Sequence, residues 1–111
     1  MTIDNLMSLK YKSKEDKIKF VKIVLSDEKR IRKKLHLAII ALNNMIENIN
    51  LEIDFACINE DEESKNIKLT IFNKRLELLK QKYEEQNKEV NLIRQYLKIL
   101  NDEIKEKKHS G

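Results

Sequence analysis

The densest group of side chains able to do chemistry is the basic run EKRIRKKLH, residues 28–36. Guanidinium and ammonium groups bind phosphate oxygens, and clusters of them mark nucleic-acid-binding surfaces. The candidate phosphate-binding residues are Arg30, Arg32, Lys33 and Lys34. Aromatic residues for base stacking are only 5% of the chain, and Asp and Glu are intermixed with the basic residues. Nucleic-acid binding is therefore the alternative function and not the preferred one.

Residues that catalysis or metal binding would need are thinly spread. His36, Cys57 and His109 are too far apart in sequence to show metal-ligand spacing. No His or basic residue adjoins Cys57 to activate its thiol, so we expect a small apolar filler there. The carboxylates of residues 60–63 lack the glycine and regular spacing of a calcium loop, and no glycine-rich phosphate loop exists. We expect no catalytic residue, metal or cofactor, and no enzyme activity.

Composition favours long helices over a compact globule. The 111 residues are enough for one domain, and 38% are charged, with one Gly and no Pro. Because 41% of the residues are apolar, a larger fraction than disordered chains have, we expect the chain to fold and bury apolar side chains. The longest apolar run, LAIIAL at residues 37–42, is far short of the roughly 18 to 20 residues of a membrane span. We expect a protein with no membrane span and an intracellular location, cytoplasmic or nuclear.

The second half of the chain repeats apolar residues at alternating steps of three and four from residue 69 onward. This a/d heptad spacing predicts a helix with a coiled-coil seam. A helix over residues 67–108 would extend about 63 Å. The predicted seam positions are Leu69, Phe72, Leu76, Leu79, Tyr83, Gln86, Val90, Ile93, Leu97, Leu100 and Ile104.

The first half follows the same rule less cleanly. Its predicted seam positions are Ile18, Val21, Leu25, Glu28, Arg32, Leu35, Ile39, Leu42, Ile46, Ile49, Ile53 and Ala56. Glu28 and Arg32 interrupt the apolar stripe, four residues apart and so spaced to pair with each other. Ser13 and Ser26, each followed closely by acidic residues, are helix-start signals. The pattern predicts either one helix over residues 14–58 with a weak place near 26, or a short helix followed by a long one.

Residues 59–66 are all Asn, Asp, Glu, Ser or Lys and predict an acidic, solvated turn. Folding the chain back here sets Leu35 opposite Val90 and Ile39 opposite Gln86, so that paired residue numbers sum to 125. Gln86, the one polar seam residue of the second helix, either fixes this register or lies in a loosely packed layer. As an alternative, residues 51–58 and 66–72 alternate like the strands of a β-hairpin, although the Asn-Gly or Asp-Gly pair of tight hairpins is missing.

A second apolar stripe indicates association. Ile71 and three further residues recur at one heptad position of the second helix, with Glu85 as the gap, and Tyr96 joins them. The candidate partner-docking residues are Leu78, Leu92, Tyr96 and Ile99. Because apolar stripes left in water cause aggregation, we expect a covering partner: a second copy of the chain or another helical protein. The alternative is that residues 1–25 fold back as a third helix and cover the stripe.

The predicted fold class is all-α: an antiparallel helical hairpin, or coiled coil, with a possible short extra N-terminal helix, dimerising into an elongated helical bundle. The hairpin domain spans residues 13–108, and residues 1–12 form a flexible arm. Charge follows this layout, because residues 1–36 carry +6, residues 37–66 carry −6 and residues 67–111 carry +4. The expected function is that of a non-enzymatic protein–protein interaction or assembly module, an adaptor that acts through its apolar stripes.

Overall fold

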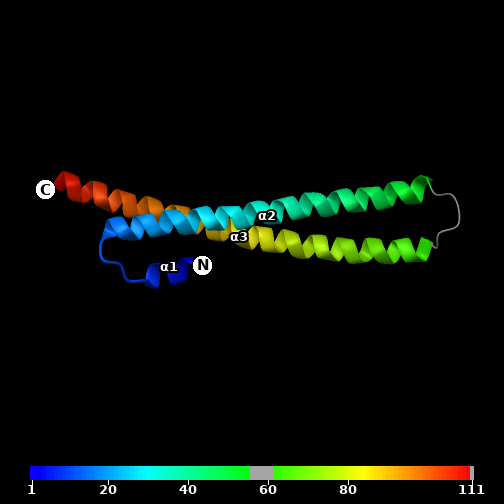
Figure 1. Cartoon of the computed structure of the whole chain (residues 1–111), viewed down its shortest axis with the longest axis horizontal. Coiled ribbons are helices and arrows are strands. Elements are labelled where there is room, and N and C mark those ends of the chain that lie inside the picture. The colour runs from blue at the N-terminus through cyan, green and yellow to red at the C-terminus, as the bar shows by residue number, and fades with distance from the viewer. Residues whose placement is uncertain (56–61, 111) are drawn as a thin grey trace. The chain divides into compact units, whose positions relative to one another are not determined.

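The chain is all-α, as the sequence predicts. The computed structural model describes residues 1–55 and 62–110, which form the helices α1 (Ile3–Ser8), α2 (Lys14–Phe55) and α3 (Glu62–Ser110) (Figure 1). No strand occurs in these two stretches. Residues 51–55 and 66–72 are helical, so the β-hairpin alternative is excluded for them. Residues 56–58, which it also used, lie outside the described residues.

Side-chain caps start the first two helices, and the cap of α2 is at the predicted signal, Ser13. The Asp16 backbone N–H donates to Ser13 Oγ at 3.2 Å, which caps α2, and Asn5 N–H donates to Thr2 Oγ1 at 3.3 Å, which caps α1. The second signal, at Ser26, starts no new helix, because α2 continues through it. Its Ser-Asp-Glu sequence lacks the Pro or Gly that would end the preceding helix, so the single-helix alternative is the correct one.

Helix α3 begins at Glu62, five residues before the expected start at residue 67. Glu63 stands in its first turn, where a carboxylate interacts favourably with the positive end of the helix dipole. Lys65, expected in the solvated turn, is buried within α3. The described part of the predicted turn, residues 62–66, therefore belongs to α3.

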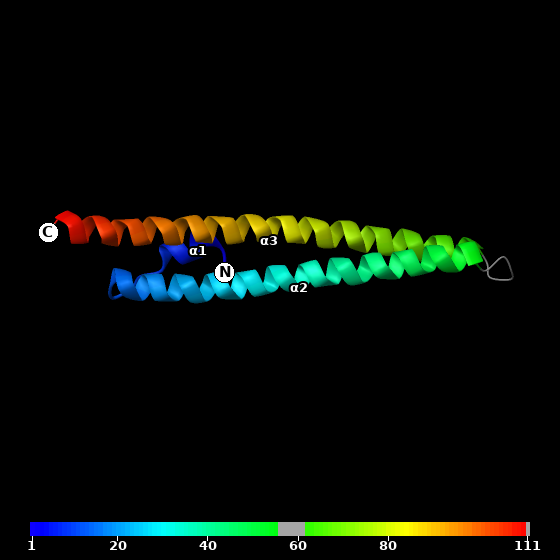
Figure 2. The ribbon, with the colours of Figure 1, turned by 90° about the horizontal axis from the view of Figure 1, so that it is seen from above.

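The described chain divides into two compact units. Unit 1 comprises Met1–Arg32 and Glu85–Gly111, and unit 2 comprises Lys33–Glu84. In each unit, α2 and α3 lie side by side and run in opposite directions (Figures 1 and 2). Unit 1 also contains α1, which packs against this helix pair.

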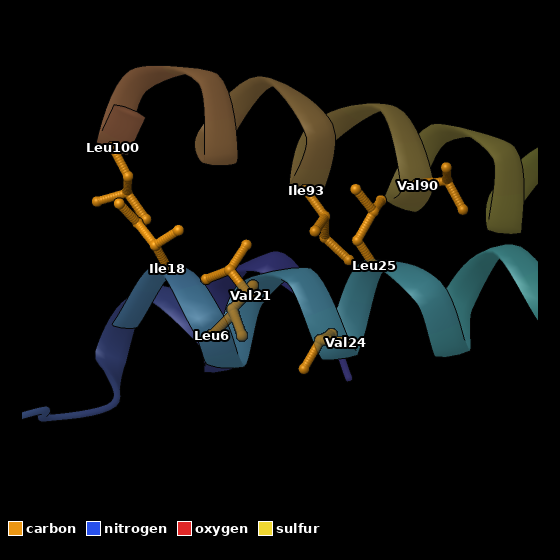
Figure 3. Close-up of a cluster of buried hydrophobic side chains, with 8 residues drawn as sticks. All are labelled: Leu6, Ile18, Val21, Val24, Leu25, Val90, Ile93 and Leu100. Carbon is orange, nitrogen blue, oxygen red and sulfur yellow. The ribbon is translucent and has the colours of Figure 1, made fainter. Parts of the chain in front are cut away.

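The core of unit 1 joins all three helices (Figure 3). Leu6 of α1, Val21 of α2, and Val90 and Ile93 of α3 are fully buried. At about 25 cal/mol per Å² of buried apolar area, such side chains supply most of the stability of a small helical unit. The buried cluster is Leu6, Ile18, Val21, Val24, Leu25, Val90, Ile93 and Leu100.

Unit 2 has a thinner core built from two helices. Leu42 of α2 and Leu76 of α3 are buried, and their seam neighbours on both helices are partly buried. The rings of His36 and Tyr83 approach with their centroids 6.0 Å apart. A two-helix layer covers only one side of each helix, so many apolar side chains of this unit stay exposed.

The predicted seam positions are confirmed. Every seam residue whose side chain is described, from Ile18 to Ile49 on α2 and from Leu69 to Ile104 on α3, is buried or partly buried. The side chains of Ile53 and Ala56 lie outside the described residues. The heptad pattern therefore identified the facing sides of both long helices.

The predicted pairing across the seam is wrong by one heptad. The expected register sets Leu25 opposite Leu100, whereas Leu25 and Ile93 point toward each other in Figure 3, as do Ile18 and Leu100. Lys14 Nζ lies 2.9 Å from Glu103 Oε2, which fits the same shift. A heptad repeat permits registers seven residues apart, so the apolar positions alone do not choose between them.

Polar side chains explain the choice of register. In the expected pairing the Gln86 amide faces Ile39, and the Glu28 carboxylate faces Leu97. Each buried polar group left without a partner costs about 1–3 kcal/mol. In the observed register Gln86 Nε2 donates to the Glu28 carbonyl oxygen at 3.0 Å and also to the Glu28 carboxylate. Sliding by one heptad thus replaces two unpaired groups by one hydrogen-bonded layer.

Candidate interaction surfaces

A buried polar layer crosses unit 1 at Glu28. Its carboxylate accepts hydrogen bonds from Gln86 and, at 2.6 Å, from the Met1 amine. Burial raises the pKa of Glu28, but these two hydrogen bonds and the positive charge of the amine outweigh burial. The pKa of Glu28 therefore lies below its ordinary value of 4.5. These contacts stabilise the charged form of the carboxylate.

The partners of this layer differ from the predicted ones. Arg32 does not pair with Glu28; its guanidinium donates to Asn87 Oδ1 at 2.8 Å. The Ile3 backbone N–H donates to the Glu89 carboxylate, which attaches α1 to α3. The predicted ion pair lies within one helix, whereas these contacts join residues from different helices.

The predicted phosphate-binding residues fall in both units. Arg30 and Arg32 belong to unit 1, where Arg30 Nη1 lies 3.8 Å from Asp27 Oδ1 and Arg32 is held by Asn87. Lys33 and Lys34 belong to unit 2 and are exposed. Arg32 is therefore engaged within the protein, and the other three side chains are open to solvent.

The predicted docking residues are exposed, with one exception. Leu92 and Ile99 lie on the surface of unit 1, and Leu78 lies on the surface of unit 2. Tyr96 is only partly buried and packs against the unit 1 core. Its ring also holds Lys17, whose Nζ lies 5.2 Å from the ring centroid. Leu78, Leu92 and Ile99 consequently offer more free apolar surface than Tyr96.

Tyr11, in the loop before α2, also contacts Lys17. Lys17 Nζ lies 5.8 Å from the Tyr11 ring centroid, and the Tyr11 and Phe20 rings are 5.6 Å apart. The Tyr11 hydroxyl is buried and finds no hydrogen-bond partner among the described residues. Burial raises the pKa of Tyr11 more than the Lys17 charge lowers it, so the phenol is neutral. The loop before α2 is thus held by aromatic packing.

A groove opens between the two helices of unit 2, with a volume of about 450 Å³. Apolar side chains form most of its lining, and two cations complete it. No ion pair to either cation occurs among the described residues. We call this feature the unit 2 groove; its lining is Ala38, Ala41, Leu42, Met45, Arg75, Leu78, Leu79 and Lys82.

Sequence reasoning missed most of this groove. It named Leu78 as a docking residue and Leu42 and Leu79 as seam positions, but not Met45 or the two cations. The available signal was the pair Ala38 and Ala41, since small residues spaced three apart on one helix face leave a hollow between larger neighbours.

The described residues form neither a metal-binding cluster nor a helix that could span a membrane. Within the described stretches, no three His, Cys, Asp or Glu side chains gather as a metal ion would require. None of the helices described has an apolar segment long enough to cross a membrane. Cys57, Glu60 and Asp61 lie outside the described residues, as does the side chain of His109.

Comparison with protein-family models, curated proteins and solved structures finds no match to this chain.

Proposed function

We propose that this chain is a non-enzymatic interaction or assembly module, an adaptor that forms a homodimer or packs against another helical protein. The observation that carries the proposal is the set of heptad-spaced apolar residues exposed on α3. Leu92 and Ile99 in unit 1, and Ile71 and Leu78 in unit 2, are each between 44% and 58% exposed. Residues seven apart share a helix face, and covering such a face gains about 25 cal/mol per Å² of apolar area.

A lone cysteine fits a reducing compartment, so we place the protein inside the cell, in the cytoplasm or the nucleus. Its partners are helical proteins, itself included, because heptad-spaced side chains interdigitate best with another helix.

Self-association is tested by comparing Leu92→Asp with Leu97→Asp. Leu92 is exposed, so its variant should keep its helicity by circular dichroism while any dimer seen by sedimentation equilibrium dissociates. Leu97 packs against the unit 1 core, and a charge there should lower the unfolding free energy by several kcal/mol. A wild-type chain that stays monomeric at high concentration would remove the homodimer from the proposal.

Nucleic-acid binding is the second candidate, and the exposure of Arg30, Lys33 and Lys34 favours it. Fluorescence anisotropy with labelled duplex DNA and single-stranded RNA at two salt concentrations separates the candidates. Tight binding that weakens steeply with salt would support contacts to phosphates. No binding at low salt would eliminate this function.

A further inference from the structure

Unit 1 shows how a short helix docks on the α2–α3 pair. Leu6 of α1 is fully buried there, and Val24, although off the α2–α3 seam, is only 7% exposed and lies in the same cluster (Figure 3). The Ile3 N–H at the start of α1 donates to the Glu89 carboxylate. The docked helix thus uses an apolar surface beside the seam and a charged side chain that complements its own polar groups.

The unit 2 groove has the same heptad positions, and no third helix among the described residues of this unit covers it. Three heptads separate Val24 from Met45, and three heptads separate Val21 from Leu42. Yet Met45 is 49% exposed where Val24 is covered. Two α2 positions of the groove, Leu42 and Met45, therefore correspond to the residues Val21 and Val24 that share a buried cluster with Leu6 in unit 1.

The charge on the α3 side of the groove is reversed. Lys82 and Arg75 precede Glu89 by one and two heptads and so occupy its heptad position. Among the described residues, neither cation forms an ion pair. Where unit 1 offers a carboxylate to α1, the unit 2 groove offers two positive charges beside an apolar floor.

We infer that the unit 2 groove binds an acidic amphipathic helix of another protein. Its apolar side chains fill the space between Ala38, Met45 and Leu78, and its carboxylates pair with Arg75 and Lys82. The inference rests on the proposed function, since it specifies one partner surface and the chemistry of its partner.

The chain's own α1 is a poor occupant of the groove. It carries a single acidic residue, Asp4, and it is already seated in unit 1 through Leu6. The lining spans seven residue steps on each long helix, from Ala38 to Met45 and from Arg75 to Lys82, or about 11 Å. A partner helix therefore needs about two turns of contact, anchored by apolar residues at i, i+3, i+4 and i+7.

The test uses a fluorescein-labelled amphipathic peptide of about 15 residues, long enough to be helical, with Leu on one face and Glu on both flanks. A matched peptide has Lys for every Glu. With the full chain, anisotropy should show the acidic peptide binding at least about tenfold more tightly than the basic one. The double variant Arg75→Glu, Lys82→Glu should invert this preference, and Met45→Asp should abolish binding.

A matched control separates the groove from general charge attraction. Lys74→Glu with Lys80→Glu changes the net charge equally, at exposed positions that do not line the groove, and should preserve the preference. Circular dichroism checks that each variant keeps its helices. Equal binding of the two peptides, or loss of preference in this control, would overturn the inference.

The inference and the proposed self-association fail separately. A dimer that Leu92→Asp dissociates, combined with no peptide binding, overturns the groove as a docking site and leaves the assembly function standing. A dimer that Leu78→Asp dissociates and that the peptide cannot enter would assign the groove to a second copy, which also overturns the inference. A monomer that binds the acidic peptide supports the groove and refutes the homodimer.

Discussion

Ile93→Ala and Ile23→Ala remove the same three carbon atoms from opposite environments. Ile93 of α3 is 0% exposed in the unit 1 core, and Ile23 of α2 is 59% exposed. Both residues lie within helices of unit 1, so backbone effects are similar in the two variants. Any difference in the unfolding free energy therefore measures burial.

The expected difference is large relative to the stability of a small protein. Three carbon atoms at about 0.8 kcal/mol each give about 2.4 kcal/mol, and the remaining cavity brings the loss for Ile93→Ala to about 3 kcal/mol. At Ile23 little burial is lost, and alanine has the higher helix propensity. That variant should lie within about 0.5 kcal/mol of the wild type.

Urea denaturation followed by far-UV circular dichroism measures both variants. With a slope of about 1.5 kcal/mol per M, Ile93→Ala should lower the urea midpoint by about 2 M, while Ile23→Ala leaves it nearly unchanged. Both are compared at one protein concentration, because association would add to stability. Equal shifts for the two variants would refute the assignment of Ile93 to the core.

Three further substitutions probe the polar and aromatic contacts of unit 1. The lowered pKa of Glu28 contributes stability that is complete above the ordinary value of 4.5 and is lost as the pH falls through the lower pKa of the folded state. The urea midpoint should therefore drop between about pH 6 and about pH 3. The drop should be smaller in Glu28→Gln, which lacks the titrating carboxyl group. Gln86→Leu should cost about 1–3 kcal/mol by leaving Glu28 acceptors unpaired, whereas Gln95→Leu, at an exposed position, should be nearly neutral in the same urea assay. Tyr11→Phe removes a buried hydroxyl without a partner among the described residues and should raise the unfolding free energy by about 1 kcal/mol; a loss would mean that the hydroxyl is bonded.

The periodicity of apolar residues was sufficient to predict the two long helices and their facing sides. Steps of three and four, as in Val90, Ile93 and Leu97, match the period of a helix and not the period of two of a strand. It was insufficient for the register. Apolar residues seven apart can replace one another in the seam. Polar contacts between the helices, such as Glu28 with Gln86 and Lys14 with Glu103, distinguish the observed register, and the pattern along one helix does not contain them.

A surface formed by one helix could be predicted from its heptad pattern, whereas a surface formed by two or three helices could not. The exposed Leu92 and Ile99 follow from one heptad position on one helix. The burial of Val24 depends on α1, whose few residues give too short a pattern to show which side of the hairpin it covers. The unit 2 groove likewise combines side chains from two helices, so its position depends on the register that the pattern left open.

The contacts that complete unit 1 also set an order of events during synthesis. Ile3 and Glu89 are 86 positions apart, and Lys14 and Glu103 are 89 apart. At about 5–20 residues per second, a ribosome that has made Leu25 needs about 3 to 14 seconds to reach its facing residue Ile93. Throughout that interval the apolar side chains of the nascent N-terminal segment stay uncovered. If translation stalls before Ile93, this segment has no α3 residue of its own chain to pack against.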